Sequence, residues 1–229
     1  CSHRGKVDNC QVGVFMGYVS RHDHALLDFR LSLPQDWARD AHRRQACHVP
    51  EDVCYQTRHE QCLEMLEAWG NQVPHSWVTG DDELGRHTQF RYELRERGER
   101  YVLGVPCNTT IRDREAPLPA YAGRGRPPKA PWQSVTQWRQ SLDAEAWTHL
   151  TVRDGEKGPV EIEMVRCRVQ TRLERKCTGP EEWLVVTRQP LSDDRTLGPR
   201  ASRDATDQDA RHRYQYYLTP TGGSEAALK

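Results

Sequence analysis

Several features that define other protein classes are missing from this sequence. No apolar run approaches the roughly 18 residues that a membrane-spanning helix needs, and the N-terminus shows no signal-peptide pattern. The eight cysteines include no Cys-x-x-Cys pair and are too sparse for a small disulfide-rich secreted scaffold. These absences predict a cytoplasmic protein with reduced thiols and no membrane partner.

An excess of charge of either sign is also missing. The 33 Lys and Arg residues balance the 33 Asp and Glu residues, so the formal net charge at pH 7 is +0. The whole chain therefore has no long-range attraction to nucleic acid, and DNA binding would require a local basic patch. Its 229 residues are enough for one sizeable hydrophobic core, or for one core with an inserted subdomain.

Familiar catalytic and metal-binding motifs are hard to find. Residues 154–159 (DGEKGP) lack the residue order of a phosphate-binding P-loop and are typical of a hairpin turn. No Ser/His/Asp or Cys/His arrangement stands out. Six potential zinc ligands occur near one another, but their spacing fits no standard zinc finger, so a zinc-stabilised interaction module is only an alternative. They are His42, Cys47, His48, Cys54, His59 and Cys62.

The first half of the chain alternates between strand and helix patterns. Residues 11–20 are nearly all apolar or small, which predicts a central strand with both faces buried. Apolar and polar residues then alternate over 27–33, which predicts a half-buried second strand and hence a hairpin. Thr57 and Glu60 have the spacing of a capping box and predict the start of a helix that ends at Gly70.

The alternation continues to about residue 110. Residues 76–79 and 101–105 read as short strands, and residues 85–97 between them read as a helix. The resulting order of elements predicts an α/β fold built on a mixed sheet over residues 1–110.

The second half has a different character. Residues 111–132 are rich in Pro, Gly and Arg, which predicts a linker. In residues 160–170 the apolar face changes after Met164, and we interpret this slip of one residue as a β-bulge. Further strands are expected at 183–187 and 214–218, so we assign 111–190 to a β-rich insert. The remaining region, 191–229, should contain a charged flexible loop at 191–213, a strand and the start of a helix.

Asp81 is the first candidate for chemistry. It follows the apolar strand of residues 76–79 through Gly80, and the end of a buried strand is where active sites of α/β proteins collect. Carboxylate oxygens are suited to Mg²⁺, which phosphodiester cleavage commonly uses in pairs. The competing interpretation is an acidic cap on the following helix. Asp82 or Glu83 could provide the cap while Asp81 binds metal, so the two roles are compatible.

The second candidate is the basic segment Arg124-Gly125-Arg126-Pro127-Pro128-Lys129. Residues 121–140 contain four basic side chains and no acidic one. An extended Arg-Gly-Arg-Pro stretch suits insertion of Arg124 and Arg126 into an A·T-rich minor groove, with Lys129 at a phosphate. Trp132 and Trp138 would add aromatic surface nearby. The alternative is an ordinary basic linker, and phosphate contact is favoured over groove recognition.

Residues 5–11 (GKVDNCQ) resemble the glycine-lysine-x-x-asparagine-cysteine-glutamine block of DDE transposases from bacterial insertion sequences, in the 701 group related to the larger four-type superfamily. Similar blocks follow in the same order to about residue 190. Each is short, but their order makes the set specific. The matching blocks are residues 25–28, 33–34, 78–81, 101–103, 105–106, 125–126, 131–132, 147 and 155–159.

This resemblance implies an RNase H-like domain with a β-rich insert between the second and third acidic residues. It also implies a Mg²⁺-dependent Asp, Asp, Glu site that cuts and joins transposon ends, and a homodimer that holds two ends. Asp81 matches the second Asp. The first Asp is expected upstream of Gly5 and the Glu downstream of Lys229, so Asp8 and Glu225 are not assigned to these roles.

We therefore expect an internal transposase fragment that lacks the first strand of its sheet, and that is inactive alone because two of the three catalytic acids are absent. Whether the chain itself is an enzyme stays undecided at this point. Two alternatives remain: a non-catalytic DNA-binding remnant that competes for transposon ends, and a pseudogene product without function.

Overall fold

The structure is a computed structural model of the chain, and it describes residues 2–3, 6–7, 11–118, 120–121, 123–155, 158–172, 178–190 and 212–221. For residues 2–3 and 6–7 only the backbone is described. Cys1, Asp8 and Glu225 lie outside these ranges, as do most of the loop predicted at 191–213 and the helix predicted near the C-terminus. The chain divides into two compact units, residues 1–76 and 77–229, which are treated separately below.

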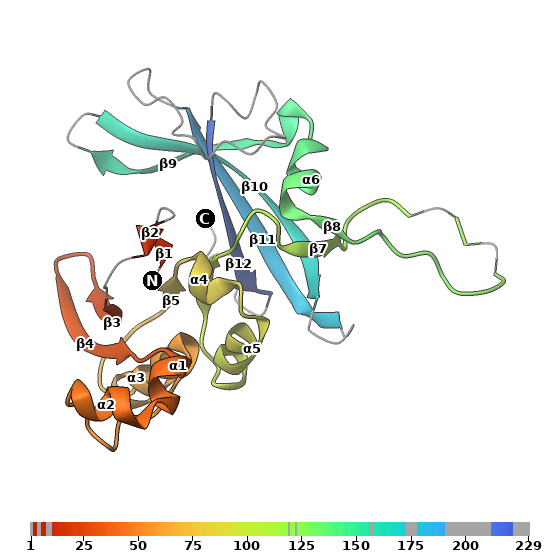
Figure 1. The fold of residues 1–229 in the computed structure, drawn as a ribbon. Helices are drawn as coiled ribbons and strands as arrows, with labels where there is room; N and C mark the ends of the chain where they lie inside the picture. Colours follow the sequence, from red (N-terminus) through yellow and green to blue (C-terminus); the bar gives the residue numbers. More distant parts are fainter. Residues whose placement is uncertain are drawn as a thin grey trace. The chain divides into compact units, whose positions relative to one another are not determined.

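The first unit contains the predicted hairpin and the predicted capped helix (Figure 1). β3 (Val12–Val19) pairs antiparallel with β4 (His24–Ser32), and Phe15 lies opposite Phe29. α3 (Arg58–Trp69) packs against this hairpin. The remaining elements of the unit are the short pair β1 (Ser2–His3) and β2 (Lys6–Val7), and the helices α1 (Gln35–Arg39) and α2 (Ala41–Ala46).

The start of α3 confirms the capping-box prediction. The Thr57 side chain accepts a hydrogen bond from the Glu60 backbone N–H, and the Glu60 carboxylate accepts one from the Thr57 N–H. The helix is held on the hairpin by its Trp69 indole, which donates to Asp28 Oδ2 at 3.0 Å. The prediction that β3 is buried on both faces was wrong: α3 covers one face, whereas Phe15 and Val19 on the other are 65% and 78% exposed.

The second unit is built on an eight-stranded mixed sheet. Its strand order is β5-β6-β12-β11-β10-β7-β8, and β9 pairs with the N-terminal half of β10. β5 and β6 are parallel, whereas the other pairs are antiparallel. The strands are β5 (Val78–Gly80), β6 (Tyr101–Gly104), β7 (Thr110–Asp113), β8 (Gln133–Ser134), β9 (Thr148–Gly155), β10 (Gly158–Arg172), β11 (Thr178–Pro190) and β12 (His212–Pro220).

Four short helical segments accompany this sheet. They are α4 (Asp82–Gly85), α5 (Thr88–Glu96), α6 (Val135–Gln140) and the 3-10 turn η1 (Ala144–Ala146). Figure 1 shows the long connection between β7 and β8 extending away from the sheet. Residue 111 belongs to β7 and not to the linker expected there. The helix predicted at 85–97 is found as α5, whereas its first residue, Gly85, is the last residue of the separate helix α4. His212 and Arg213 belong to β12 and not to the predicted loop.

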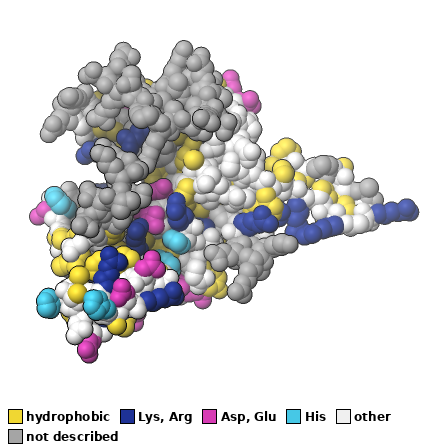
Figure 2. All heavy atoms as spheres, viewed as in Figure 1, with side chains coloured by type: hydrophobic (Ala, Val, Ile, Leu, Met, Phe, Trp, Pro, Cys, Tyr) yellow, Lys and Arg dark blue, Asp and Glu magenta, His cyan; other side chains and the backbone are white. Residues whose placement is uncertain are grey.

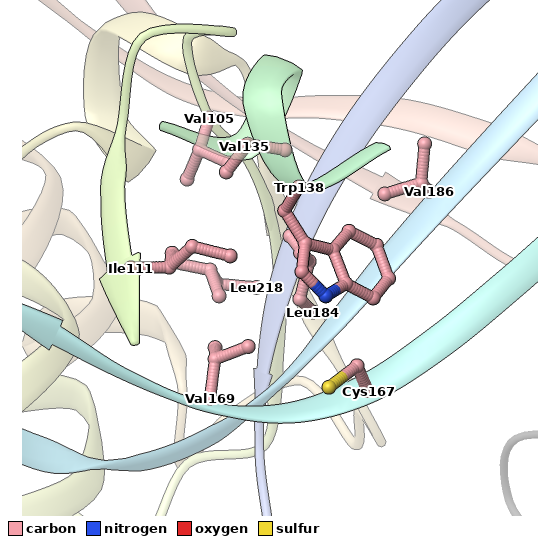
Figure 3. Packing of buried hydrophobic residues seen from close by; sticks show 9 residues of the cluster. All are labelled: Val105, Ile111, Val135, Trp138, Cys167, Val169, Leu184, Val186 and Leu218. Atoms are coloured by element: carbon pink, nitrogen blue, oxygen red, sulfur yellow. The ribbon is translucent and has the colours of Figure 1, made fainter. Parts of the chain in front are cut away.

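The hydrophobic core of this unit lies between one face of the sheet and α6 (Figure 3). It is formed by apolar side chains that are at most 4% exposed: Val105, Ile111, Val135, Trp138, Cys167, Val169, Leu184, Val186 and Leu218. Trp138 is thus a core residue, and it does not add to an exposed aromatic surface as the sequence suggested.

The slip of the apolar pattern in β10 is not a bulge. β10 pairs with β11 without interruption from Glu163, opposite Arg188, to Gln170, opposite Glu181. Before Met164 the apolar residues lie on the face away from the core, and after it they lie on the core face. The strand therefore keeps its period of two and changes which face is apolar. Register shifts in β10 do occur, at Val160/Glu161 and Gln170/Arg172.

Candidate functional site

Asp81 lies directly after β5, at the point where the chain enters α4. Its backbone is extended, and its Oδ1 accepts hydrogen bonds from the backbone N–H groups of Glu83 at 3.2 Å and Leu84 at 3.3 Å. The side chain therefore caps α4, as the competing interpretation of the sequence expected. The residue is nevertheless exposed, and Oδ2 accepts no hydrogen bond from the described residues.

Two glycines set the position of this turn. A Cβ atom on Gly85 would lie 1.8 Å from the carbonyl oxygen of Gly104, so α4 can approach β6 only because Gly85 has no side chain. A Cβ on Gly104 would lie 3.1 Å from the Asp82 nitrogen, so the first turn of α4 is also close to β6. Close packing of the backbone against β6 therefore holds the Asp81 turn on the sheet.

A divalent metal needs more ligands than this turn provides. Asp82 is exposed beside Asp81, and Glu83 forms an ion pair with Arg86 at 3.7 Å. In the described ranges no group of three or more His, Cys, Asp or Glu side chains is placed to hold a metal ion. Asp81 has a carboxylate oxygen that fits a hard cation. The described residues do not, however, form a complete metal site, and no catalytic step through a metal follows from them.

The positions of the six potential zinc ligands also test the zinc-stabilised module. All six of its potential ligands lie within the described ranges, and no three of them come together. Cys62 lies on α3, and Cys47 and Cys54 are exposed free thiols. The structure therefore does not form the zinc-stabilised module.

The basic segment lies on the long connection between β7 and β8, which we call the arm (residues 114–132). Arg124, Arg126 and Lys129 are all exposed there. Figure 2 shows Lys and Arg side chains along the arm. Gly123 and Gly125 have φ values of 75° and 82°, and the Tyr121 hydroxyl donates to the Gly125 carbonyl at 2.8 Å. This left-handed backbone favours glycine, so the Gly125 position has a structural reason.

Arg139 does not belong to this basic surface. It is 7% exposed in α6, and its guanidinium lies 3.9 Å from the centre of the Tyr214 ring. Of the four basic residues counted in the sequence, only the three on the arm are exposed. Among the described residues, no hydrogen bond or ion pair links these three to Asp81.

Asp113, at the end of β7, anchors the first residues of the arm. Its Oδ1 accepts from the backbone N–H groups of Glu115 at 2.7 Å and Ala116 at 3.0 Å, and from the Cys167 thiol. Its Oδ2 accepts from the Trp138 indole at 2.9 Å. Burial by itself would raise the pKa of Asp113, but the hydrogen bonds outweigh it and lower the pKa. The arm therefore starts from a fixed turn.

A buried polar network near Asp81 was not predicted. The Arg91 guanidinium on α5 donates to both oxygens of Glu182 on β11, to Thr171 on β10 and to the Gly85 carbonyl at the end of α4. The Tyr101 hydroxyl donates to Glu182 as well, at 2.7 Å. Burial and the neighbouring Glu182 charge raise the pKa of Tyr101. The sequence contains one indication of this network. Side chains alternate along a strand, so Glu182 lies on the same face of β11 as the apolar residues Leu184 and Val186.

The family model of the DDE superfamily endonucleases matches residues 1–159. The chain belongs to the DDE superfamily endonuclease family. No curated protein matches it significantly. The mixed α/β fold, with its sheet of parallel and antiparallel strands, is consistent with the predicted RNase H-like DDE fold.

Membership of this family indicates the kind of metal ion and the kind of partner. DDE superfamily endonucleases use divalent metal ions and act on DNA. In the described part of the chain no helix is long and apolar enough to cross a membrane. The roles of Asp81, Arg124, Gly125, Arg126 and Lys129, and the boundaries at 110 and 190, remain predictions.

Proposed function

We propose that this chain belongs to a transposase of a bacterial insertion sequence, in the 701-like group, an enzyme that cleaves and transfers DNA strands, and that the residues of this chain alone do not complete its catalytic site. The observation that carries the proposal is the position of Asp81 in a member of the DDE endonuclease family. Asp81 is exposed at the end of a parallel strand, and one of its oxygens is not used by the helix cap. In this role Asp81 would be one ligand of Mg²⁺, and a bound cation would supply Lewis-acid chemistry at the phosphodiester.

The arm supplies the contact with DNA in this proposal. Arg124 and Arg126 enter the minor groove of A·T-rich DNA or bind phosphates at transposon ends, and Lys129 binds a phosphate. Gly125 keeps the backbone between the arginines narrow, because it has no side chain. The protein acts in the cytoplasm as a homodimer that holds two transposon ends.

An exchange of Asp81 for asparagine tests the metal role without removing the helix cap, since Asn caps helices as well as Asp does. Asp82→Asn is the matched control, because it removes the neighbouring exposed carboxylate. We expect Asp81→Asn to weaken Mn²⁺ binding, measured by electron paramagnetic resonance, by more than the roughly 10- to 100-fold cost of losing an outer-shell partner. Unchanged Mn²⁺ affinity in Asp81→Asn would remove the proposed role.

Non-catalytic DNA binding is a second candidate function, supported by the exposure of Arg124, Arg126 and Lys129 on an arm segment without acidic residues. In that case Asp81→Asn would leave DNA affinity and its salt dependence unchanged, whereas an Arg124→Ala/Arg126→Ala variant would weaken both. Metal-dependent cleavage by the wild-type chain would exclude a purely non-catalytic role.

A further inference from the structure

One face of β7 and β10 carries a row of arginines. β7 and β10 pair so that Ile111 lies opposite Thr171 and Arg112 lies opposite Gln170. Ile111, Val169 and Thr171 are at most 1% exposed on the core face. Because side chains alternate along a strand, the intervening positions lie on the opposite face. On β10 these positions are Arg166, Arg168, Gln170 and Arg172.

Neighbouring carboxylates neutralise only part of this row. Arg168 forms an ion pair with Glu115 at 2.9 Å, and Arg114, just after β7, forms one with Glu181 at 2.8 Å. For Arg112, Arg166 and Arg172, no ion pair with a carboxylate is formed among the described residues. Positive charge that local acids do not compensate therefore remains on this face.

The same three arginines are packed on tryptophan rings. The Arg112 guanidinium lies 4.2 Å from the centre of the Trp132 ring, and that of Arg172 lies 5.9 Å from the same centre. Arg166 lies 5.1 Å from the centre of the Trp183 ring. Stacking uses the flat face of a guanidinium and leaves the N–H groups at its edge available. The rings thus hold the arginines in position without using their hydrogen-bond donors, although the Nε of Arg112 is buried and cannot reach a ligand.

We propose that Arg112, Arg166 and Arg172, held by Trp132 and Trp183, form a surface that binds the sugar-phosphate backbone of duplex DNA. The inference rests on the proposed function, in which DNA is the partner. Arginine suits this role because its planar fork matches two phosphate oxygens. The surface also continues directly into the arm, since Trp132 is the last residue of the arm.

The spacing of the row favours a polymer over a free anion. Arg166 and Arg172 are six residues apart on one strand, which corresponds to about 20 Å at roughly 3.3 Å per residue. A DNA duplex carries one phosphate per about 3.4 Å of helix axis on each strand, so a row of this length extends along a stretch of backbone with more than one phosphate. A single phosphate ion could not contact both Arg166 and Arg172 across this distance.

The test measures duplex binding as a function of salt. Fluorescence anisotropy with a labelled duplex of mixed sequence, between about 50 and 200 mM KCl, gives the slope of log K against log salt. We expect an Arg112→Gln/Arg166→Gln/Arg172→Gln variant to reduce the magnitude of this slope by about 2.7, since each lost phosphate contact removes about 0.9. Arg153→Gln is the matched control: an exposed arginine of β9 that stacks on no tryptophan in the described part of the chain.

Three outcomes would overturn the inference. They are an unchanged slope in the triple variant, a lower affinity without a change of slope, or no duplex binding by the wild-type chain. Circular dichroism confirms that each variant is folded. A parallel Arg124→Ala/Arg126→Ala variant separates this inference from the proposed function. If only the arm variant lowers the slope, the arginine row fails and the arm stands; if only the triple variant does, the arm fails and the row stands.

Discussion

Arg91 and Glu182 form an ion pair inside the second unit, with 2.9 Å between Nε and Oε1 and with side chains that are 3% and 0% exposed. The pair joins α5 to β11. Through the Gly85 carbonyl and Thr171, Arg91 also connects the end of α4 with β10. The turn that carries Asp81 is therefore tied to the antiparallel part of the sheet by one side chain.

Replacing only one member of this ion pair should destabilise the fold more than replacing both members. We expect Arg91→Met to lower the free energy of unfolding by about 3–5 kcal/mol, because Glu182 would keep a buried charge without its partner. The double variant Arg91→Met/Glu182→Leu should recover much of this loss, since no unpaired charge remains. Urea unfolding followed by circular dichroism measures both values. Additive losses in the double variant would contradict the expectation.

Gly85 should tolerate no side chain. In Gly85→Ala the new methyl group would meet the Gly104 carbonyl oxygen, which is backbone and cannot move aside cheaply. We expect a loss of about 1–3 kcal/mol in the free energy of unfolding, the usual range for overpacking. Gly17→Ala is the control, because its Cβ would lie 3.6 Å from the Ala25 oxygen in ordinary contact. Equal stability of the two variants would show that α4 is not held closely on β6.

Asp113 should make the free energy of unfolding depend on pH in the acid range. Its hydrogen bonds hold the pKa below the ordinary value of 3.8. A carboxylate with a lowered pKa in the folded state stabilises the protein at pH values above its unfolded pKa of about 3.9. This contribution is lost as the pH falls through the lower pKa of the folded state.

We therefore expect the difference in unfolding free energy between wild type and Asp113→Asn to be largest near neutral pH and to shrink below about pH 4. Denaturant unfolding over a pH series measures this difference. Asp143→Asn is the control, because Asp143 is exposed and its side chain makes no cap hydrogen bond to η1. A difference that stays constant across the series would show that the Asp113 charge is not involved.

Much of the local structure could be predicted because short-range interactions determine it. The side chains of Thr57 and Glu60 each accept a hydrogen bond from the other residue's backbone N–H within one helical turn. Their spacing alone therefore predicts the start of α3. The turn at Gly155 and Gly158 was predicted in the same way, and these two residues pair across it. The assignment of Asp81 to the end of a strand also depended on neighbouring residues only.

The errors arose where distant segments meet. Trp138 was expected to add aromatic surface near the arm, and Arg139 was counted among the basic residues of 121–140, but α6 packs both against the sheet. The change of apolar face along β10 was interpreted as a bulge. A sequence does not show that apolar residues can lie on one face in the first half of a strand and on the other face in the second half. Among the described residues of the first unit, β3 pairs with β4 and α3 packs on one of its faces, so its apolar pattern overstated its burial.

The sequence by itself determined the class of the protein, the capped helix, the strand that leads to Asp81 and the basic composition of the arm, because each depends on residues close together in the chain. Only the tertiary structure decided that Arg91 faces Glu182, 91 residues away, and that Arg112 and Arg172 share Trp132. These relationships depend on strand register and order in the sheet. Long-range packing fixes both, because a shift of one residue in the register of a strand would exchange the two faces of that strand.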